Sequence, residues 1–574
     1  MKKYMNRLFV ALGAASMLGF TGCIEETFPT DMATPEQVSS SSQSLQYMTN
    51  SLPAYIVTKS TYSGGDFDWG YTCQMYVREL YGEDFPANDD GYNMWKYAER
   101  ASSEILNVAL YSFSYYYHLI KNANNVIVMA SDLAATGNAN AKASLGQGYG
   151  FRALSYLDMA RLFEFRPTGV ERLDNAAQED GVMGITVPIL RENMTVSEYK
   201  NNPCVPFYTM YRFIMNDLNK AEECLEGYKQ STIAFMDQNV IYGLKARLWL
   251  TMATRFENSP EDLAKQIEAD ANTDGYGVLG ITSANDCYQK VAEYAQKAIK
   301  GHTPLTEEEW TEPTTGFNTP QSSWLMGASV TSKEQVNNTT WHQLIGILAS
   351  ETTWGFNQYN FFRCIGKSLY DQIGSGDWRK NSWIAPADAG KSAVPSQYKT
   401  NLTDATWKKL PAYSNIKFRP GSGSLVSRET GSIGDFPMMR VEEMYFDYFE
   451  AIAHTQSVTD AAAALQEFVN KYRYTDNSYT CKATTLKDFN KALMVQRRIE
   501  FWGEGINMFD YKRLRLAVTR NYNGTNYKTD FIRLNSNAGY VAPWMNYRIP
   551  ESELTYNQAI ILAPIECYCG AIIY

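Results

Sequence analysis

The sequence predicts a mostly α-helical protein, a TPR-like helical repeat scaffold (an α/α superhelix) with a loop-rich, irregular face. Helical periodicity of apolar residues dominates residues 100–300 and returns after about residue 436. Residues 301–435 lack that periodicity and are rich in turn-forming residues. A hydrophobic fraction of 45% in 574 residues is enough for a sizeable core and excludes global disorder.

Five segments between residues 100 and 300 place apolar residues at helical spacing. They are Tyr115–Ile127, Tyr149–Phe163, Tyr211–Leu225, Asn239–Ala253 and Tyr288–Ile299. Small residues in these segments let paired helices approach, and large residues from the next helix fill the gaps. Because the spacing between the segments is irregular, we expect degenerate repeats.

The remaining chain divides into a loop-rich region and a C-terminal helical region. A stretch as long as residues 301–435 without regular structure is often functional. Helical periodicity resumes in Arg440–His454, Asp460–Tyr472 and Leu486–Trp502. Since no sharp linker is present, we expect one body over residues 51–574. Its parts are the helices (about 100–300), a loop-rich ligand face (about 301–435) and the C-terminal region (about 436–574).

Residues 1–22 are predicted to be a lipoprotein signal peptide. Basic residues precede an apolar run, Leu8–Phe20, that is too short to span a bilayer. The following Thr21-Gly22-Cys23 completes a sequence that resembles a lipobox, which predicts cleavage before Cys23 and lipidation of its thiol. Residues 23–50 are polar and Ser-rich and are interpreted as a lipidated flexible tether. The alternative is an ordinary signal peptide followed by an incidental Cys.

The composition narrows the class of function. A net charge of −10 argues against nucleic acid as a partner, because no excess of cations is present to displace phosphate counterions. The chain has 40 Tyr, 26 Phe and 12 Trp but four His, which suits a surface that stacks on ligands better than a His-based catalytic or metal site. No cofactor or metal is expected, although the Asp-rich loops could hold Ca²⁺ weakly.

Several motifs resemble one known family, and the C-terminal block is the most specific. Residues 496–514, QRRIEFWGEGINMFDYKRL, are very similar to the pattern RRxEF-x-EGxRxxDxxR, with Asn507 in place of the usual Arg. Further matches are Lys121–Ile127, Phe151–Leu162, Gly184–Pro188, Pro437–Tyr445 followed by Glu450-Ala451, and Ile549-Pro550 followed by Glu553 and Asn557. Together they resemble the SusD/RagB family of Bacteroidetes outer-membrane lipoproteins.

This resemblance, which covers essentially the whole chain, implies a cell-surface glycan-binding protein for polysaccharide utilisation. Such a protein is the lid of a SusC-like TonB-dependent transporter, to which it hands captured oligosaccharide, and it catalyses no reaction. The lipid on Cys23 would hold it at the outer membrane, exposed at the cell surface. Two other hypotheses stay open: a TPR-like surface adaptor or peptide-uptake component that binds protein or peptide, and, least favoured, a glycoside hydrolase.

The candidate ligand contacts lie in two loop stretches, around residues 66–95 and 310–359. Sugars present flat apolar faces between hydroxyls, which exposed aromatic rings and polar side chains recognise. The resemblance implies an arc of aromatic residues outside the repeat helices. The predicted contacts are Trp69, Asp84, Asn88, Tyr92, Trp95, Trp310, Asn338 and Trp341, and Trp324 and Trp354 are further candidates. Trp249 and Trp502, which lie in helical segments, are predicted to be core residues.

Glu500 and Glu504 are, by residue type, a candidate catalytic pair. Their four-residue spacing puts both on one helical face, whereas a glycosidase needs carboxylates on two sides of the sugar. Nearby arginines should also keep both ionised, which leaves no general acid. We therefore predict that the acidic and basic residues of this block form ion pairs between packed helices.

Overall fold

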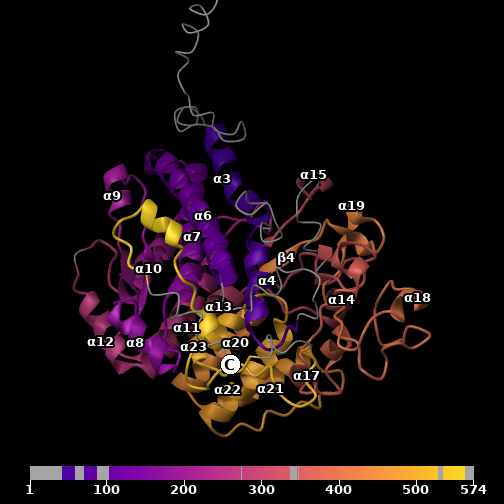
Figure 1. Ribbon diagram of the computed structural model, residues 1–574. Coiled ribbons are helices and arrows are strands. Elements are labelled where there is room, and N and C mark those ends of the chain that lie inside the picture. Colours follow the sequence, from indigo (N-terminus) through magenta and orange to yellow (C-terminus); the bar gives the residue numbers. More distant parts are fainter. Residues whose placement is uncertain are drawn as a thin grey trace, which may run out of the picture.

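The computed structural model describes residues 42–58, 70–86, 103–272, 274–336, 345–346, 348–527 and 534–562. Within these residues the chain is mostly helical, which confirms the predicted class (Figure 1). Its strands are short and form two antiparallel pairs, β1 (Ile185–Pro188) with β2 (Cys204–Pro206) and β3 (Trp324–Ala328) with β4 (Phe436–Arg440). None of the helices in the described ranges has the length and apolarity needed to cross a membrane.

The five predicted helical segments are confirmed as helices. They are α6 (Ser103–Ala135), α7 (Ala139–Phe163), α10 (Phe207–Cys224), α11 (Gln238–Asn258) and α13 (Ala284–Ile299). Each packs against the next, and glycines allow the closest approaches. A Cβ atom at Gly148 of α7 would lie 2.8 Å from Cγ1 of Ile127 in α6, and one at Gly150 would lie 2.6 Å from the sulfur of Met236.

The other described helices of this half are α3 (Ser42–Val57), α4 (Tyr71–Tyr81), α8 (Glu171–Glu179), α9 (Val196–Lys200) and α12 (Pro260–Ala269). Side-chain caps set where several helices begin, because they satisfy backbone N–H groups of the first turn. Asn138 caps α7 and Asp237 caps α11, and Thr195 with Glu198 forms a capping box on α9.

The loop-rich character of residues 301–435 is also confirmed. The described elements there, besides β3, are α14 (Glu307–Thr311), α15 (Lys333–Val336), α17 (Lys367–Tyr370), α18 (Asp404–Trp407), α19 (Arg428–Gly431) and the 3-10 helices η1 (Gly355–Tyr359), η2 (Trp378–Ser382) and η3 (Gly421–Gly423). These loops enclose buried side chains of their own, among them Ile384 and Trp407. The irregular backbone is therefore packed from within.

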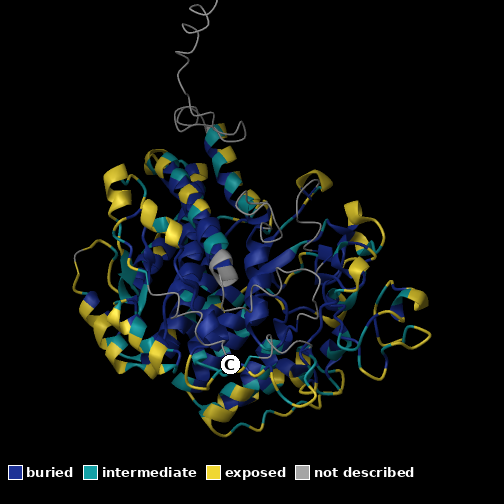
Figure 2. Ribbon diagram, viewed as in Figure 1, coloured by how far each residue is buried: buried dark blue, intermediate teal, exposed yellow. Residues whose placement is uncertain are grey.

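The C-terminal region supplies α20 (Val441–Thr455), α21 (Val458–Tyr472), α22 (Leu486–Glu500), α23 (Asn507–Leu514) and the 3-10 helices η5 (Pro543–Met545) and η6 (Glu551–Thr555). Helix α20 packs against α13, α21 and α22 and so joins this region to the first half. One cluster of buried apolar side chains runs from Leu52 to Ile560 and draws on all three regions. Buried residues fill the centre, and exposed residues mark α9, α12 and α18 at the periphery (Figure 2).

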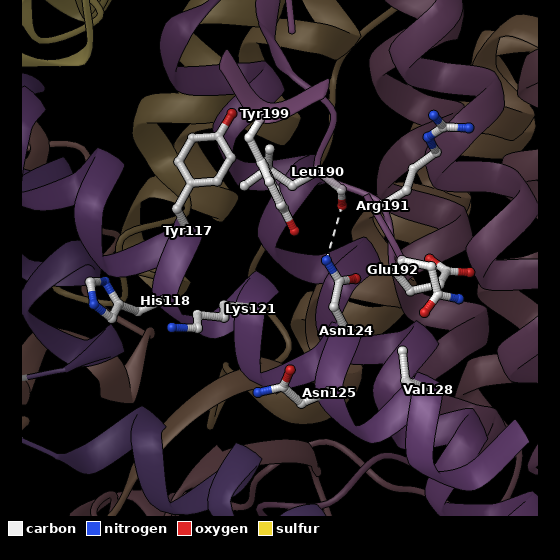
Figure 3. Close-up of a pocket in the computed structure, with 11 residues that line it drawn as sticks. Tyr117, His118, Lys121, Asn124, Asn125, Val128, Leu190, Arg191, Glu192 and Tyr199 are labelled. Atoms are coloured by element: carbon white, nitrogen blue, oxygen red, sulfur yellow. Dashed lines mark hydrogen bonds between the residues drawn. The ribbon is translucent and has the colours of Figure 1, made fainter. Parts of the chain in front are cut away.

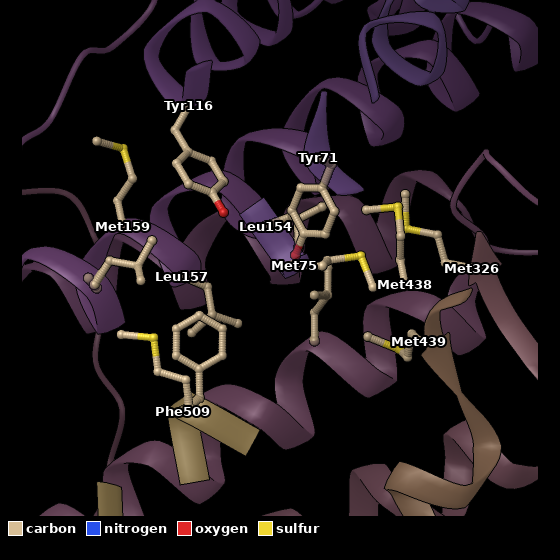
Figure 4. Close-up of a cluster of buried hydrophobic side chains, with 14 of the residues drawn as sticks. Tyr71, Met75, Tyr116, Leu154, Leu157, Met159, Met326, Met438, Met439 and Phe509 are labelled. Atoms are coloured by element: carbon tan, nitrogen blue, oxygen red, sulfur yellow. The ribbon is translucent and has the colours of Figure 1, made fainter. Parts of the chain in front are cut away.

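The centre of the core lies where α4, α7, β3, β4 and α23 meet. Met and aromatic side chains gather there (Figure 4). Beside them the fully buried Asp158 carboxylate accepts hydrogen bonds from the hydroxyls of Tyr71 (2.6 Å) and Tyr116 (2.9 Å) and from the Arg78 guanidinium (3.1 Å). Burial opposes the charge, but Arg78 and the other donors hold the pKa of Asp158 down at about 2.

The predicted ion pairs of the C-terminal block are confirmed. Glu500 is fully buried and accepts hydrogen bonds from Arg379 (2.8 Å), Arg440 (3.0 Å) and Arg473 (2.8 and 2.9 Å). Although burial opposes its charge, these arginines hold the pKa of Glu500 well below its usual range. A carboxylate held ionised in this way cannot act as a general acid, and its role is to join η2, β4 and α21 to α22.

Candidate ligand-binding groove

Trp310 and Asp84 are the two predicted contact residues that lie within the described ranges, and Trp310 is a core residue. Its side chain is 1% exposed, and its indole N–H donates to the Ser382 hydroxyl over 2.9 Å. Of the three glutamates before it in the first turn of α14, Glu307 and Glu308 are exposed and Glu309 closes a capping box with Thr306, so the acidic residues did not indicate the burial of the indole. The prediction that Trp310 contacts a ligand is therefore corrected. Trp324 and Trp354 are buried too, as are Trp249 and Trp502, for which burial was predicted.

Asp84 is also buried, and the prediction that it contacts a ligand is corrected in the same way. Arg498 donates to the two carboxylate oxygens of Asp84 over 2.7 and 2.5 Å. The two residues are 414 positions apart, so the polar neighbours of Asp84 in the sequence gave no sign of its partner. The other predicted contacts lie outside the described residues, as does the lipidation site: Trp69, Asn88, Tyr92, Trp95, Asn338, Trp341 and Cys23.

A Trp310→Ala variant is expected to lower the free energy of unfolding by about 3–5 kcal/mol, because it leaves a large cavity and an unpaired Ser382 hydroxyl. Denaturant unfolding measures this loss. In a matched Tyr359→Ala variant, whose ring is 51% exposed, we expect a change within about 0.5 kcal/mol. If Trp310→Ala had wild-type stability but no longer bound glycan, Trp310 would be a ligand contact and not a core residue.

A groove with a volume of about 470 Å³ follows one face of α6 (Figure 3). Helix α6 supplies Tyr117, His118, Lys121, Asn124, Asn125 and Val128, which recur at helical spacing and so form one stripe. The opposite wall is the segment from Leu190 to Asn193 after β1, together with Tyr199 of α9. In the close-up, the side chains of Tyr117, Tyr199, Lys121 and Asn124 surround the open space (Figure 3).

A buried arginine holds the two walls together. Arg152 of α7 donates to the side-chain oxygen of Asn124 over 2.7 Å and forms an ion pair with Glu192. The same guanidinium makes a two-bond contact with the Asp217 carboxylate of α10, at 2.7 and 2.8 Å. Asn124 in turn donates to the Leu190 carbonyl over 3.2 Å (Figure 3). The shape of the groove is therefore set by contacts within the core.

The groove continues toward the C-terminal end of the described chain. A second cavity of about 270 Å³ shares Tyr117, His118, Leu190 and Tyr199 and extends to Glu553, Tyr556 and Asn557 near η6. We call the two cavities together the α6 groove. Asn557 holds this added wall in place, because its side-chain amide donates to the Asn202 carbonyl over 2.6 Å. Two tyrosine rings stand at the opening, Tyr199 with 39% of its side chain exposed and Tyr556 with 70%.

The charge state of the lining groups suits hydrogen bonding. Burial raises the pKa of Tyr117 well above its ordinary value, so its hydroxyl stays neutral and donates to the Pro188 carbonyl over 2.6 Å. Burial opposes ionisation of Glu192, but the Arg152 guanidinium lowers the pKa of that carboxyl below its ordinary value. Burial raises the pKa of Glu553. The groove therefore offers flat rings beside amide, hydroxyl and ammonium groups, which can bind a hydroxyl-rich ligand.

Sequence reasoning missed Tyr199 and Tyr556. The available signal for Tyr199 is the capping box of Thr195 and Glu198, which marks a short helix among polar residues. Tyr556 lies between Glu553 and Asn557, two residues of the closing motif, and the motif does not show that the intervening ring is exposed. Among 40 tyrosines, neither has a neighbourhood that predicts exposure.

Comparison with known proteins identifies the fold. The sequence profile described as the SusD family matches residues 390–566. A SusD-like carbohydrate-binding protein from Bacteroides vulgatus is similar in structure, with a TM-score of 0.65, 19% identity, and coverage of 90% of this chain and 97% of that chain. A SusD superfamily protein from Bacteroides thetaiotaomicron gives a TM-score of 0.63 at 17% identity, covering 91% and 99%. One from Parabacteroides distasonis gives 0.61 at 16% identity, covering 91% and 98%.

No curated protein matches the sequence significantly. The matched profile lies over the region that carries the most specific motif, residues 496–514, and the structural matches extend over about nine tenths of the chain. The resemblance drawn from the sequence is thus confirmed: residues 390–566 carry the sequence pattern of the SusD family, and the chain has the fold of the SusD superfamily.

Proposed function

We propose that this chain is a non-catalytic glycan-binding protein and that the α6 groove is a glycan site. The observation that carries the proposal is the pair of exposed rings, Tyr199 and Tyr556, beside a row of amide and ammonium donors on α6. Rings stack on the apolar faces of sugars, and the donors reach the hydroxyls between those faces. The fold supports this assignment, since a similar structure is described as a carbohydrate-binding protein.

We further propose that the protein is a lipid-anchored lid of a SusC-like TonB-dependent transporter at the surface of the outer membrane. The lipobox-like sequence ending at Cys23 supports the anchor. The start of α3 and the short helix α9 lie at the same end of the molecule (Figure 1). A tether that leads from Cys23 to α3 would therefore hold the α6 groove toward the membrane, where a transporter could take over the ligand.

A specific feature also favours the second hypothesis, a peptide-uptake component. Apolar side chains beside the groove are exposed, namely Val196 of α9 (70%), Leu554 of η6 (43%) and Ile561 (61%). A surface that combines apolar side chains with amide groups can hold a peptide as well as a sugar. The choice between the two ligands is made by the titration below.

Tyr199→Ala and Tyr556→Ala are each expected to weaken glycan binding about tenfold, which corresponds to the loss of one stacking contact. Isothermal titration of the chain without its signal peptide against a panel of oligosaccharides and peptides measures the affinity. Tyr47→Ala is the matched control, because Tyr47 of α3 is 64% exposed and does not line the groove. Unchanged affinity in both groove variants would contradict the site, and binding of peptides alone would select the second hypothesis.

The loop residues predicted from the sequence stay proposed contacts of the same ligand. They are Trp69, Asn88, Tyr92, Trp95, Asn338 and Trp341. Trp95→Ala and Trp341→Ala belong in the same titration. If these two variants lose binding while Tyr199→Ala and Tyr556→Ala retain it, the glycan site lies on the loops and not in the α6 groove.

A further inference from the structure

Another pocket lies along α22. Its volume is about 740 Å³. One stripe of α22 from Leu486 to Arg498 forms the first wall, and the end of α23 with the following segment, Leu514–Ala517, forms the facing wall. The stripe spans twelve residue steps, so the pocket follows α22 for about 18 Å. We call it the α22 pocket; it shares no lining residue with the α6 groove.

The middle of the α22 pocket is apolar. Met494 and Val495 of α22 face Leu514, Leu516 and Ala517 across it. Four of these five side chains are only partly buried, so the pocket leaves apolar surface in contact with water. Covering that surface with an apolar ligand would be favourable, at about 25 cal/mol per Å² of area removed from water.

One end of the α22 pocket carries uncompensated positive charge. Lys487 and Lys491 stand one turn apart on α22, both exposed, and neither forms an ion pair within the described part of the chain. Arg515 of the facing wall forms no ion pair within the described residues either, but the Asp262 and Glu164 carboxylates attract it, and its Nε atom is buried without a hydrogen-bond acceptor. Arg498 at the other end differs, because Glu83 and Asp84 neutralise it.

Two buried polar atoms of the pocket lining have no hydrogen-bond partner. The side-chain oxygen of Asn490, between the two lysines on α22, is buried and accepts no hydrogen bond. Unsatisfied buried polar atoms are costly: the other one, the Nε–H of Arg515, is a donor that an anionic group can satisfy, whereas the oxygen of Asn490 is an acceptor and needs a donor. The chain as a whole carries a net charge of −10, so the lysines at this end of the pocket form a local excess of cations, which favours an anionic ligand.

We propose that the α22 pocket binds a single-chain anionic amphiphile, a small molecule with one extended apolar chain and a carboxylate or phosphate group. The apolar chain would lie between Met494 and Leu514, and the anion would contact Lys487, Lys491 and Arg515. The cavity volume lies in the range of small-molecule sites. Helix α22 lies at the end of the molecule opposite the start of α3 (Figure 1), which favours a free amphiphile over a lipid of the anchoring membrane.

The probe for the test is sodium decanoate below its micelle concentration, titrated into the chain without its signal peptide. Saturable binding is expected, and the Lys487→Gln/Lys491→Gln variant should weaken it about tenfold, the equivalent of about 1.4 kcal/mol. Uncharged decanol should bind about tenfold more weakly than decanoate. The control variant Lys408→Gln/Lys409→Gln removes two exposed lysines of the loop-rich region and should leave the affinity unchanged.

Three results would overturn the proposal: no saturable binding of decanoate, equal binding by the Lys487→Gln/Lys491→Gln variant, or binding of anionic phospholipid vesicles without binding of free decanoate. A second variant, Val495→Asp, puts a carboxylate in the apolar wall and should abolish binding. Denaturant unfolding of each variant shows that the fold is intact. The affinity of Lys487→Gln/Lys491→Gln for oligosaccharides should match that of the wild type. The proposed amphiphile site and the proposed glycan site are therefore tested independently.

Discussion

A Glu500→Gln variant is expected to lose about 3–5 kcal/mol of unfolding free energy, because removing one partner from a buried ion cluster leaves the other charges uncompensated. Three arginines from η2, β4 and the end of α21 converge on this carboxylate, and none of the four residues is appreciably exposed. The glutamine amide keeps the shape of the side chain, so the measured loss reports charge and hydrogen bonding. Denaturant unfolding at neutral pH measures this loss of unfolding free energy.

The pH dependence of stability should change in the same variant. The folded-state pKa of Glu500 lies well below its ordinary value, so this carboxylate stabilises the fold above its unfolded pKa of about 4.3, and that contribution is lost as the pH falls. Between about pH 3 and pH 6 the stability of Glu500→Gln should therefore vary less steeply than that of the wild type.

Glu551→Gln is the matched control for this prediction. Glu551 forms an ion pair with Arg548 at 3.2 Å, but its side chain is 63% exposed. Exposed ion pairs contribute from nothing to about 1 kcal/mol, so the control should unfold almost like the wild type. If the unfolding free energy of Glu500→Gln stayed within about 1 kcal/mol of the wild-type value, the ion pairs between Glu500 and the arginines would contribute little to stability.

The helices of this protein could be predicted because their signals are local. The periodicity of Leu486–Trp502 matches α22 to within two residues, and the segment Tyr149–Phe163 lies within α7 and ends with it, although α7 begins ten residues earlier, at Ala139. The segment Gly184–Pro188 likewise contains β1. The helical signals depend on residues three or four positions apart, and tertiary packing reinforces them.

Exposure could not be predicted in the same way, because it depends on partners that are distant in the sequence. Trp310 has acidic neighbours, yet Ser382 and the Lys417 ammonium, 4.7 Å from its ring centre, enclose it. Asp84 lies in a polar stretch, yet Arg498 covers it. The exposed rings, Tyr199 and Tyr556, line one cavity with Tyr117 although the three residues are far apart in the sequence. A side chain's burial is therefore a property of the assembled fold.

An Arg152→Met variant is expected to weaken both the fold and the α6 groove. Methionine fills most of the space of the aliphatic part but leaves the Asp217 carboxylate, which is fully buried, without its two-bond partner. An uncompensated buried charge of this kind costs about 3–5 kcal/mol. Asn124 and Glu192 would also lose the contact that holds the groove walls, and glycan affinity should fall about tenfold.

Glu192→Gln separates the two effects. It removes the ion pair on the groove side, where Glu192 is 26% exposed, and leaves the Asp217 contact in place. We expect it to cost no more than about 1 kcal/mol of stability and to lower glycan affinity, whereas Arg152→Met lowers both. Equal stability of Arg152→Met and the wild type would contradict the role of this arginine in the fold.

The pH dependence of Arg152→Met gives an independent check. Burial already raises the pKa of Asp217 in the presence of Arg152, and without that cation the pKa of the folded state should rise further above the unfolded value. A carboxyl group whose folded-state pKa is raised is neutral in both states below its unfolded pKa, where it does not destabilise the fold. As the pH rises toward and through the folded-state pKa, the buried charge destabilises the fold. The stability gap between Arg152→Met and the wild type should therefore be smaller at about pH 5 than at about pH 8. A gap independent of pH would mean that the lost stability came from packing and not from the Asp217 charge.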